Sequence, residues 1–261
     1  MIKSLVLNKH LAYNLVIGDI KSKYFGSFTG FFGSILNPLL TLLIYTFVFS
    51  GILKIKFGLI EGMANFAIYL FCGLLPWLGF SEAVQRSSTV MLDQRSLIKR
   101  TKFPKIILPF YLTCSAFINQ LFALLAFLTV LIITQYMIQW PFFLLILIFP
   151  AQILFTFGCC LIVSVLNIFF RDIGIFLATF LQLWFFCTPI FYPETLIPER
   201  FLPILKINPL FHLVKIYRST LLDGNIPPFS SVIWFIFFTV LSTILGFVTF
   251  QRVEEKIVDF A

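Results

Sequence analysis

Charged residues are scarce in this chain, at 11% of its 261 residues, whereas a soluble domain carries roughly 25%. Five long gaps, residues 24–53, 62–81, 106–170, 173–193 and 224–251, contain no Asp, Glu, Lys or Arg. A soluble core of this size would need charged side chains on its solvent faces. The scarcity therefore excludes a soluble fold and indicates an integral membrane protein.

Motifs for nucleotide, metal or nucleophile chemistry are also lacking. The chain has no GxxxxGK[ST] loop, no HExxH and no GxSxG, so it shows no P-loop, zinc-protease or serine-hydrolase signature. The histidines His10 and His212 are far apart, and the five cysteines lack CxxC spacing, which argues against a zinc site or a disulfide framework. We expect no catalytic residue, metal site or cofactor on this chain.

No expected span has an acidic residue in its middle, and only Arg171-Asp172 comes close, at a span end. Ion-coupled carriers usually need such groups within the membrane. The internal repeats of secondary transporters are not evident either. If the protein moves a substrate uphill, the energy must come from a partner.

What the chain does contain is a series of long apolar segments. A membrane-spanning helix needs about 20 apolar residues, so four gaps fit one helix each and the longest fits two, divided at 135–141. The sequence predicts an all-α membrane protein with six transmembrane helices, near 31–53, 64–82, 107–134, 142–169, 173–192 and 232–250. Residues 1–261 are expected to form one domain: an N-terminal helix at 1–30, the six-helix bundle at 31–250 and a tail at 251–261.

The distribution of basic residues predicts the orientation. With the N-terminus inside, the segments on the cytoplasmic side carry thirteen Lys and Arg residues and the opposite side carries six. An excess of Lys and Arg marks cytoplasmic loops, so both termini are expected in the cytoplasm. The same distribution accounts for the net charge of +8 without a nucleic-acid partner.

Three segments outside the spans have distinct patterns. Residues 1–30 predict an amphipathic helix lying in the membrane interface, the alternative being a solvated leader. Segment 85–105 is the most basic of the chain, and its part 93–103 predicts a short helix that docks on a protein partner, the alternative being orienting charge alone. The proline-rich but apolar segment 189–231 predicts short re-entrant or interfacial helices, broken at Asn208-Pro209, beside a pathway.

Aromatic residues are the remaining feature, since Phe alone accounts for 36 positions. Phe180, Trp184 and Phe191 are spaced by four and seven residues and can line one helix face. Aromatic faces suit the C–H surfaces of sugars. The alternative is that these residues face lipid.

At this point the chain resembles a known family over essentially its whole length. The marks, in chain order, are Leu97-Ile98-Lys99-Arg100 continuing to Pro109, Arg171-Asp172-Ile173, Thr188-Pro189-Ile190-Phe191-Tyr192-Pro193, and Asn208-Pro209-Leu210 with Tyr217-Arg218. They resemble the membrane subunit of type-2 ABC exporters, specifically the Wzm-like permeases for O-antigen and other cell-surface polysaccharides.

The resemblance implies a multi-pass protein of the bacterial inner membrane that forms a homodimeric channel. Two Wzt-like ATPases would drive it and would hold the ATP and magnesium. Its substrate would be a polysaccharide on undecaprenyl diphosphate. An exporter of teichoic acid, drug or lipid, and a passive channel or scaffold, remain the alternatives.

Three sets of residues are candidates for the channel, for the entry of the lipid and for coupling to the ATPase. For the channel they are Tyr45, Phe49, Phe180, Trp184, Phe191 and Tyr192. For receiving the lipid pyrophosphate they are Lys21, Lys23 and Arg171, because cations at the cytoplasmic interface attract phosphate. For coupling to the ATPase they are Arg95, Leu97, Ile98, Lys99 and Arg100, with the apolar pair as the anchor and the cations as its rim.

Overall fold

The structure, a computed structural model, describes residues 7–24, 44, 47, 63–100, 103–134, 139–170 and 172–254. These residues form an all-helical arrangement. The longer elements are α2 (Lys9–Tyr24), α4 (Met63–Asp93), α6 (Ile107–Ile133), α7 (Leu145–Phe169), α8 (Ile173–Phe186), α10 (Pro209–Leu221) and α11 (Phe229–Val253). The shorter ones are α5 (Arg95–Arg100), η2 (Trp140–Leu144), η3 (Glu194–Leu196), η4 (Glu199–Phe201) and α9 (Leu202–Leu205).

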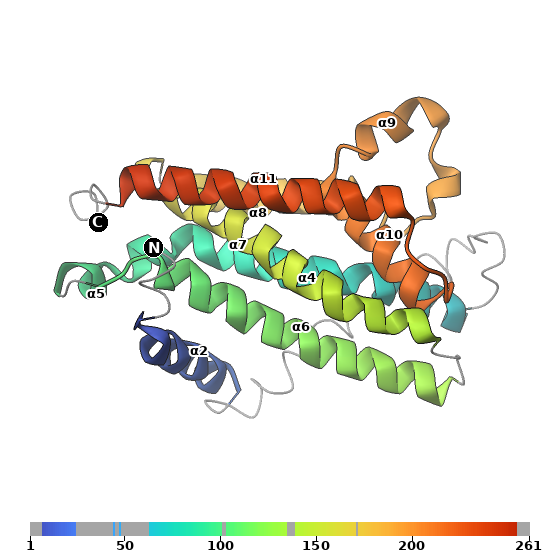
Figure 1. Ribbon diagram of the computed structural model, residues 1–261, viewed down its shortest axis with the longest axis horizontal. Helices are drawn as coiled ribbons and strands as arrows, with labels where there is room; N and C mark the ends of the chain where they lie inside the picture. Colours follow the sequence, from blue (N-terminus) through green and yellow to red (C-terminus); the bar gives the residue numbers. More distant parts are fainter. Residues whose placement is uncertain are drawn as a thin grey trace.

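The long helices lie side by side and run alternately in opposite directions (Figure 1). One end of the bundle carries α2, α5 and the last turn of α11, and we call it the α5 end. The other carries η2, α9 and α10, and we call it the α9 end (Figure 1). Lys105 donates a hydrogen bond to the carbonyl oxygen of Glu254, which joins the start of α6 to the end of α11 at the α5 end. The grouping of α2, α5 and the end of α11 agrees with the expected common side, and the side itself stays a prediction.

Four helical stretches are long and apolar enough to cross a membrane: Phe66–Asp93, Ile107–Ile133, Trp140–Phe169 and Phe229–Val253. Helix α8, of 14 residues, is apolar but shorter than these four. The four stretches and α8 correspond to the second to sixth expected spans. The uncharged gap at 106–170 is divided between α6 and η2, as predicted. The first expected span, 31–53, lies almost entirely outside the described residues, so six spans stay a prediction.

Two predicted boundaries are wrong. The second span was expected to end at residue 82, but α4 continues to Asp93 and carries Glu82 and Arg86 within a continuous helix. The fifth was expected to reach residue 192, but α8 ends at Phe186 and turns follow. Charge scarcity locates apolar chain, whereas a helix continues wherever its backbone and packing allow, and the closely spaced Pro189 and Pro193 disfavour its continuation.

The closest helix packing joins α7 and α11. A Cβ atom on Gly158 would lie 2.5 Å from the backbone of Ser242, and one on Gly246 would lie 2.5 Å from the Gly158 oxygen. Only hydrogen fits at either position. Small residues spaced by four let membrane helices approach closely and gain dispersion contacts along their backbones.

A buried polar network fixes the register of three further helices. Tyr217 on α10 donates to the side-chain oxygen of Gln152 on α7 at 2.7 Å and accepts from Gln120 on α6 at 3.0 Å. Gln152 also donates to the main-chain oxygen of Pro76 on α4 at 3.0 Å. Buried polar groups are costly unless paired, so this network favours one arrangement of the four helices.

Candidate functional site

Helix α8 packs on the bundle through one narrow stripe. Leu177, Leu181 and Phe185 are buried, and their spacing of four places them on one face. The opposite face is exposed and apolar, and it includes Ile175, Phe176, Phe180, Leu183 and Phe186. A wide apolar surface on a helix of this protein faces lipid, a second subunit or a passage between subunits.

Phe180 and Trp184, which were expected to line one face, are neighbours on α8 but differ in exposure. The Phe180 side chain is 53% exposed. Trp184 is half-buried, its ring lies 5.3 Å from that of Phe80, and its indole N–H donates to Asn208 at 2.9 Å. The two rings still touch, with centroids 5.3 Å apart. Phe180 is therefore the accessible member, and Trp184 connects α8 to the segment before α10.

Asn208 connects the end of α8 to the start of α10. Its side-chain oxygen accepts from the backbone N–H of Leu210 at 3.0 Å, which caps the helix that begins at Pro209. Its side-chain nitrogen donates to the hydroxyl of Thr188 at 2.9 Å. The predicted break at Asn208-Pro209 is confirmed, and the asparagine joins the two sides of the turn.

Phe191 and Tyr192 belong to an aromatic cluster at the end of α8. The Phe191 ring lies 5.5 Å from Phe186 and 5.0 Å from Tyr192, at angles typical of edge-to-face pairs. The Tyr192 hydroxyl donates to the Phe186 carbonyl oxygen at 3.1 Å. Tyr45 and Phe49 lie outside the described residues, so their side of the expected channel stays a prediction.

A buried arginine, to which the sequence reasoning assigned no role, holds the turn that carries this cluster. The guanidinium of Arg218 on α10 donates to the carbonyl oxygens of Pro189 at 2.6 Å and Ile190 at 2.5 Å. It stacks over the Tyr69 ring at 3.7 Å. A Cβ on Gly73 would lie 2.9 Å from the same guanidinium. Its position in the Tyr217-Arg218 pair was the only signal in the sequence.

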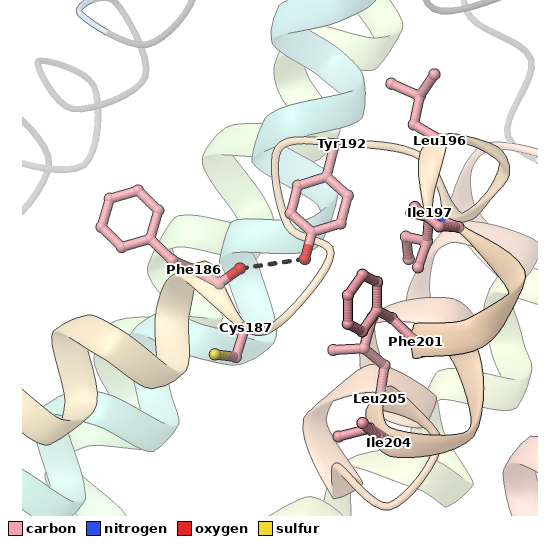
Figure 2. A pocket seen from close by; sticks show the side chains of 9 residues that line it. Phe186, Cys187, Tyr192, Leu196, Ile197, Phe201, Ile204 and Leu205 are labelled. Carbon is pink, nitrogen blue, oxygen red and sulfur yellow. Dashed lines mark hydrogen bonds between the residues drawn. The ribbon is translucent and has the colours of Figure 1, made fainter.

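An apolar pocket of about 440 Å³ opens beside this turn. Its lining comes from the end of α8 and from the short helices η3, η4 and α9: Phe186, Cys187, Tyr192, Leu196, Ile197, Pro198, Phe201, Ile204 and Leu205. Figure 2 shows Tyr192 between Phe186 and the side chains of Leu196, Ile197 and Phe201. The segment between the fifth and sixth spans therefore consists of short helices, as predicted, with an apolar hollow facing α8.

At the α5 end, α2 is attached by an ion-pair cluster across three helices. The Asp19 carboxylate accepts two hydrogen bonds from Arg86 of α4, one of them at 3.0 Å, and one from Ser115 of α6 at 2.5 Å. Lys23 lies 2.5 Å from Glu82 of α4 and 3.5 Å from Asp19. Burial raises the pKa of Asp19, but these donors outweigh burial and hold that pKa below its ordinary value of 3.8.

Helix α2 packs on the protein through one face. Ala12 and Val16 are buried, while Tyr13 is 64% exposed. Of the residues expected to receive pyrophosphate, Lys21 is exposed and Lys23 is in the ion-pair cluster. Arg171 lies outside the described residues. Their role stays a prediction.

Helix α5 forms where a docking helix was expected, but its two apolar residues point to different surroundings. Ile98 is 3% exposed and belongs to a buried cluster with Val16, Met91 and Ile106. Leu97 is 38% exposed. Arg95 is half-buried, Lys99 is exposed, and the Arg100 side chain is not described. Ile98 therefore anchors α5 to its own chain, whereas Leu97 is partly exposed, and the docking role of the pair stays a prediction.

Among the described residues, no cluster of three or more His, Cys, Asp or Glu side chains could hold a metal ion. The described cysteines are unpaired thiols. Within this part of the chain, the chemistry available is hydrogen bonding, charge and apolar contact, which suits binding and movement.

Comparison with known proteins agrees with these features. The chain is 29% identical to an O-antigen export system permease protein RfbA of Klebsiella pneumoniae, over 92% of this chain and 91% of the relative. It is 30% identical to a protein of the same name from Myxococcus xanthus, over 87% and 86%. It is 25% identical to the polysialic acid transport protein KpsM of Escherichia coli, over 92% of both chains.

The family described as ABC-2 type transporter matches residues 11–222, which include most of α2 and the helices from α4 to α10. Members of this family are membrane domains without ATPase activity, which agrees with the missing P-loop. The chain belongs to the ABC-2 type transporter family and is a multi-pass membrane permease.

Proposed function

We propose that this protein is the channel-forming subunit of an exporter that moves a lipid-linked polysaccharide across the bacterial inner membrane. The observation that carries the proposal is the pair of RfbA relatives, which match almost end to end. KpsM, named for another polysaccharide, supports the substrate class at lower identity. The carrier would be undecaprenyl diphosphate and the polymer an O-antigen or similar glycan.

The proposed assembly is a homodimer with two copies of a Wzt-like ATPase, which would hold ATP and magnesium. The exposed apolar face of α8 supports a dimer, because a channel between two copies needs one such face from each. The aromatic residues Phe180, Phe191 and Tyr192, with Tyr45 and Phe49, would contact the moving polymer. Each contact is weak, so the polymer is released as easily as it is held.

A deletion strain tests the substrate class. Loss of the permease should remove the surface polysaccharide and leave lipid-linked glycan inside the cell, detected by immunoblot and by mass spectrometry of extracted lipids. Accumulation of a teichoic acid, or of no glycan at all, would contradict the proposal and favour the teichoic acid, lipid or drug alternative.

A matched pair of phenylalanines tests the channel role. Phe180 on α8 is 53% exposed and Phe237 on α11 is 52% exposed, and each touches a tryptophan. Phe180→Ala should lower export several-fold, whereas Phe237→Ala should leave export unchanged if Phe237 faces lipid. Equal export by the two variants, at equal membrane levels, would contradict a channel role for Phe180.

Cysteine cross-linking tests the dimer. Cysteines placed at Phe49 and Trp184 are expected to cross-link between subunits in the assembled complex. Monomeric behaviour of the active complex would contradict the proposed channel.

A further inference from the structure

The carboxylate of Asp19 lies in a pocket of donors that would suit a phosphate group. Four donor atoms converge on it: both terminal nitrogens of Arg86, the hydroxyl of Ser115, and the Lys23 ammonium at 3.5 Å. They come from α4, α6 and α2. We call these three residues the anion cradle.

The cradle has the geometry that phosphate prefers. A guanidinium presents parallel N–H groups that match two oxygens of a carboxylate or of a phosphate equally well. Ser115 is fully buried, so its hydroxyl needs an acceptor among its neighbours, and that acceptor is Asp19. The Asp19 side chain is 11% exposed and the Arg86 side chain 30%, so the cradle is sheltered but lies near the surface.

The charge balance explains why the cradle can change its anion. With Asp19 in place, Asp19 and Glu82 balance Lys23 and Arg86. Without Asp19, one positive charge remains, because Glu82 alone then faces both cations: it lies 2.5 Å from Lys23 and 3.5 Å from Arg86, and it also accepts from Asn119 at 2.9 and 3.0 Å. A partly buried cation that loses its nearer partner favours another anion in its place, so the cradle attracts an anion when Asp19 leaves it.

Asp19 belongs to the element best placed to leave. It is on α2, which packs on α6 and whose described side chains include two buried apolar ones, Ala12 and Val16. Arg86 and Ser115, in contrast, lie on the long bundle helices α4 and α6. A small shift or rotation of α2 would remove the carboxylate and leave the donors of α4 and α6 in position.

We propose that Asp19 occupies, as an internal substitute, the binding site for a phosphate group of a lipid-linked diphosphate, and that the lipid binds by displacing it. The inference rests on the proposed function for the identity of the lipid. It assigns the main receiving role to Arg86, which the sequence did not single out, and gives Lys23 a supporting one. While α2 is docked, Asp19 keeps ordinary anionic lipids out of the cradle.

Binding of a diphosphate lipid to the chain reconstituted in nanodiscs tests the inference. The probe is a polyprenyl diphosphate, with the matching polyprenol and inorganic pyrophosphate as comparisons, and native mass spectrometry gives the apparent Kd. Asp19→Ala empties the cradle and should tighten polyprenyl diphosphate binding about tenfold. Arg86→Gln should weaken it at least tenfold, and Arg86→Lys several-fold. The polyprenol should bind all variants alike, and pyrophosphate alone should bind weakly.

A charge exchange separates the cradle from a purely structural ion pair. The double variant Asp19→Arg with Arg86→Asp restores an ion pair between α2 and α4 but places a carboxylate where phosphate would bind. It should keep α2 docked, so that a cysteine at Ala12 reacts slowly with a thiol reagent, yet bind the diphosphate at least tenfold more weakly. The matched control exchanges Glu194 and Lys215, which lie 2.6 Å apart at the other end, and should change neither reading.

Unchanged affinity in Asp19→Ala, or wild-type affinity in the exchanged pair, would overturn the inference and leave the cluster as a structural anchor. These readings do not depend on export. A deletion strain that still exports its polysaccharide would refute the proposed function alone. Affinities for the diphosphate that do not follow the expected order among the variants would refute the cradle alone.

Discussion

The central arginines at the two ends of the bundle, Arg86 and Arg218, are held by different interactions. At the α5 end, side chains of opposite charge join α2 to α4 and α6, with Asp19 and Arg86 at the centre. At the α9 end, Arg218 is bonded to the main-chain oxygens of Pro189 and Ile190 and stacked on Tyr69. One cation is paired with a side-chain anion and the other with backbone.

This difference has a physical consequence. A side-chain ion pair can exchange one partner for an anion of similar shape, because guanidinium binds phosphate as well as carboxylate. A carbonyl oxygen belongs to the chain and cannot leave without moving the turn. We therefore expect the α5 end to respond to ligands and the α9 end to hold a fixed shape.

The largest effect should follow from removing the backbone-bound cation. Arg218→Met keeps an apolar side chain of some length but removes charge-assisted hydrogen bonds worth about 1.5–3 kcal/mol each. The turn carrying Phe191 and Tyr192 then loses its position, and export should fall at least tenfold. Surface polysaccharide, measured at equal membrane levels of the protein, checks this.

A conservative variant sharpens the test at Arg218. Arg218→Lys keeps the charge but cannot reproduce the planar fork, so its export should lie between those of wild type and Arg218→Met. Full export by Arg218→Met would show that the α9 end does not depend on this cation.

The next effect concerns the two neighbours on α5. Ile98→Ser should destabilise the chain by about 2–5 kcal/mol, the usual cost of truncating a buried aliphatic side chain, and lower its level in the membrane. Leu97→Ser should leave the level unchanged but weaken association with the ATPase, measured by co-purification. Equal loss of association at full protein level in both variants would restore the original prediction that the two residues form one docking anchor.

A smaller effect should appear on acidification. Because the pKa of Asp19 in the docked state is below its ordinary value of 3.8, its contribution is complete well above pH 3.8 and is lost as the pH falls through the lowered value. The protection factors of the α2 amides against hydrogen exchange should therefore stay high at pH 5 and fall only below about pH 3.8. Asp19→Asn should give low protection factors at both pH values. Low protection of the wild type at pH 5 would contradict the docked pair.

The smallest effect should come from the exposed pair at the α9 end. Lys215 and Glu194 lie 2.6 Å apart but are each about one third exposed, and such pairs contribute about 0–1 kcal/mol. Lys215→Gln should change export less than twofold. Lys23→Gln at the α5 end should cost clearly more, because Lys23 contacts Glu82, Asp19 and Ser115 together. Equal effects would remove the distinction between the clusters.

The sequence by itself determined the class of protein. Long gaps without charge predict apolar helices because no charged side chain is stable in hydrocarbon without a partner. The structure has helices at the second to sixth expected spans. The short helix within 93–103 and the break at Asn208-Pro209 were also predicted and are present, because proline and asparagine act on the adjacent backbone, while the docking role of the short helix stays a prediction. The family followed from motifs in order along the chain.

Only the tertiary structure decided which residues share a site. Asp19, Arg86 and Ser115 are separated by up to 96 positions, and no local pattern joins them. Ile98 and Leu97 are neighbours with the same chemistry, yet one is buried and the other is partly exposed, because a helix turns adjacent side chains about 100° apart. The partner of a charge depends on the packing of distant helices, so the pairs that fix α2 and the α8 turn were decided only when the bundle formed.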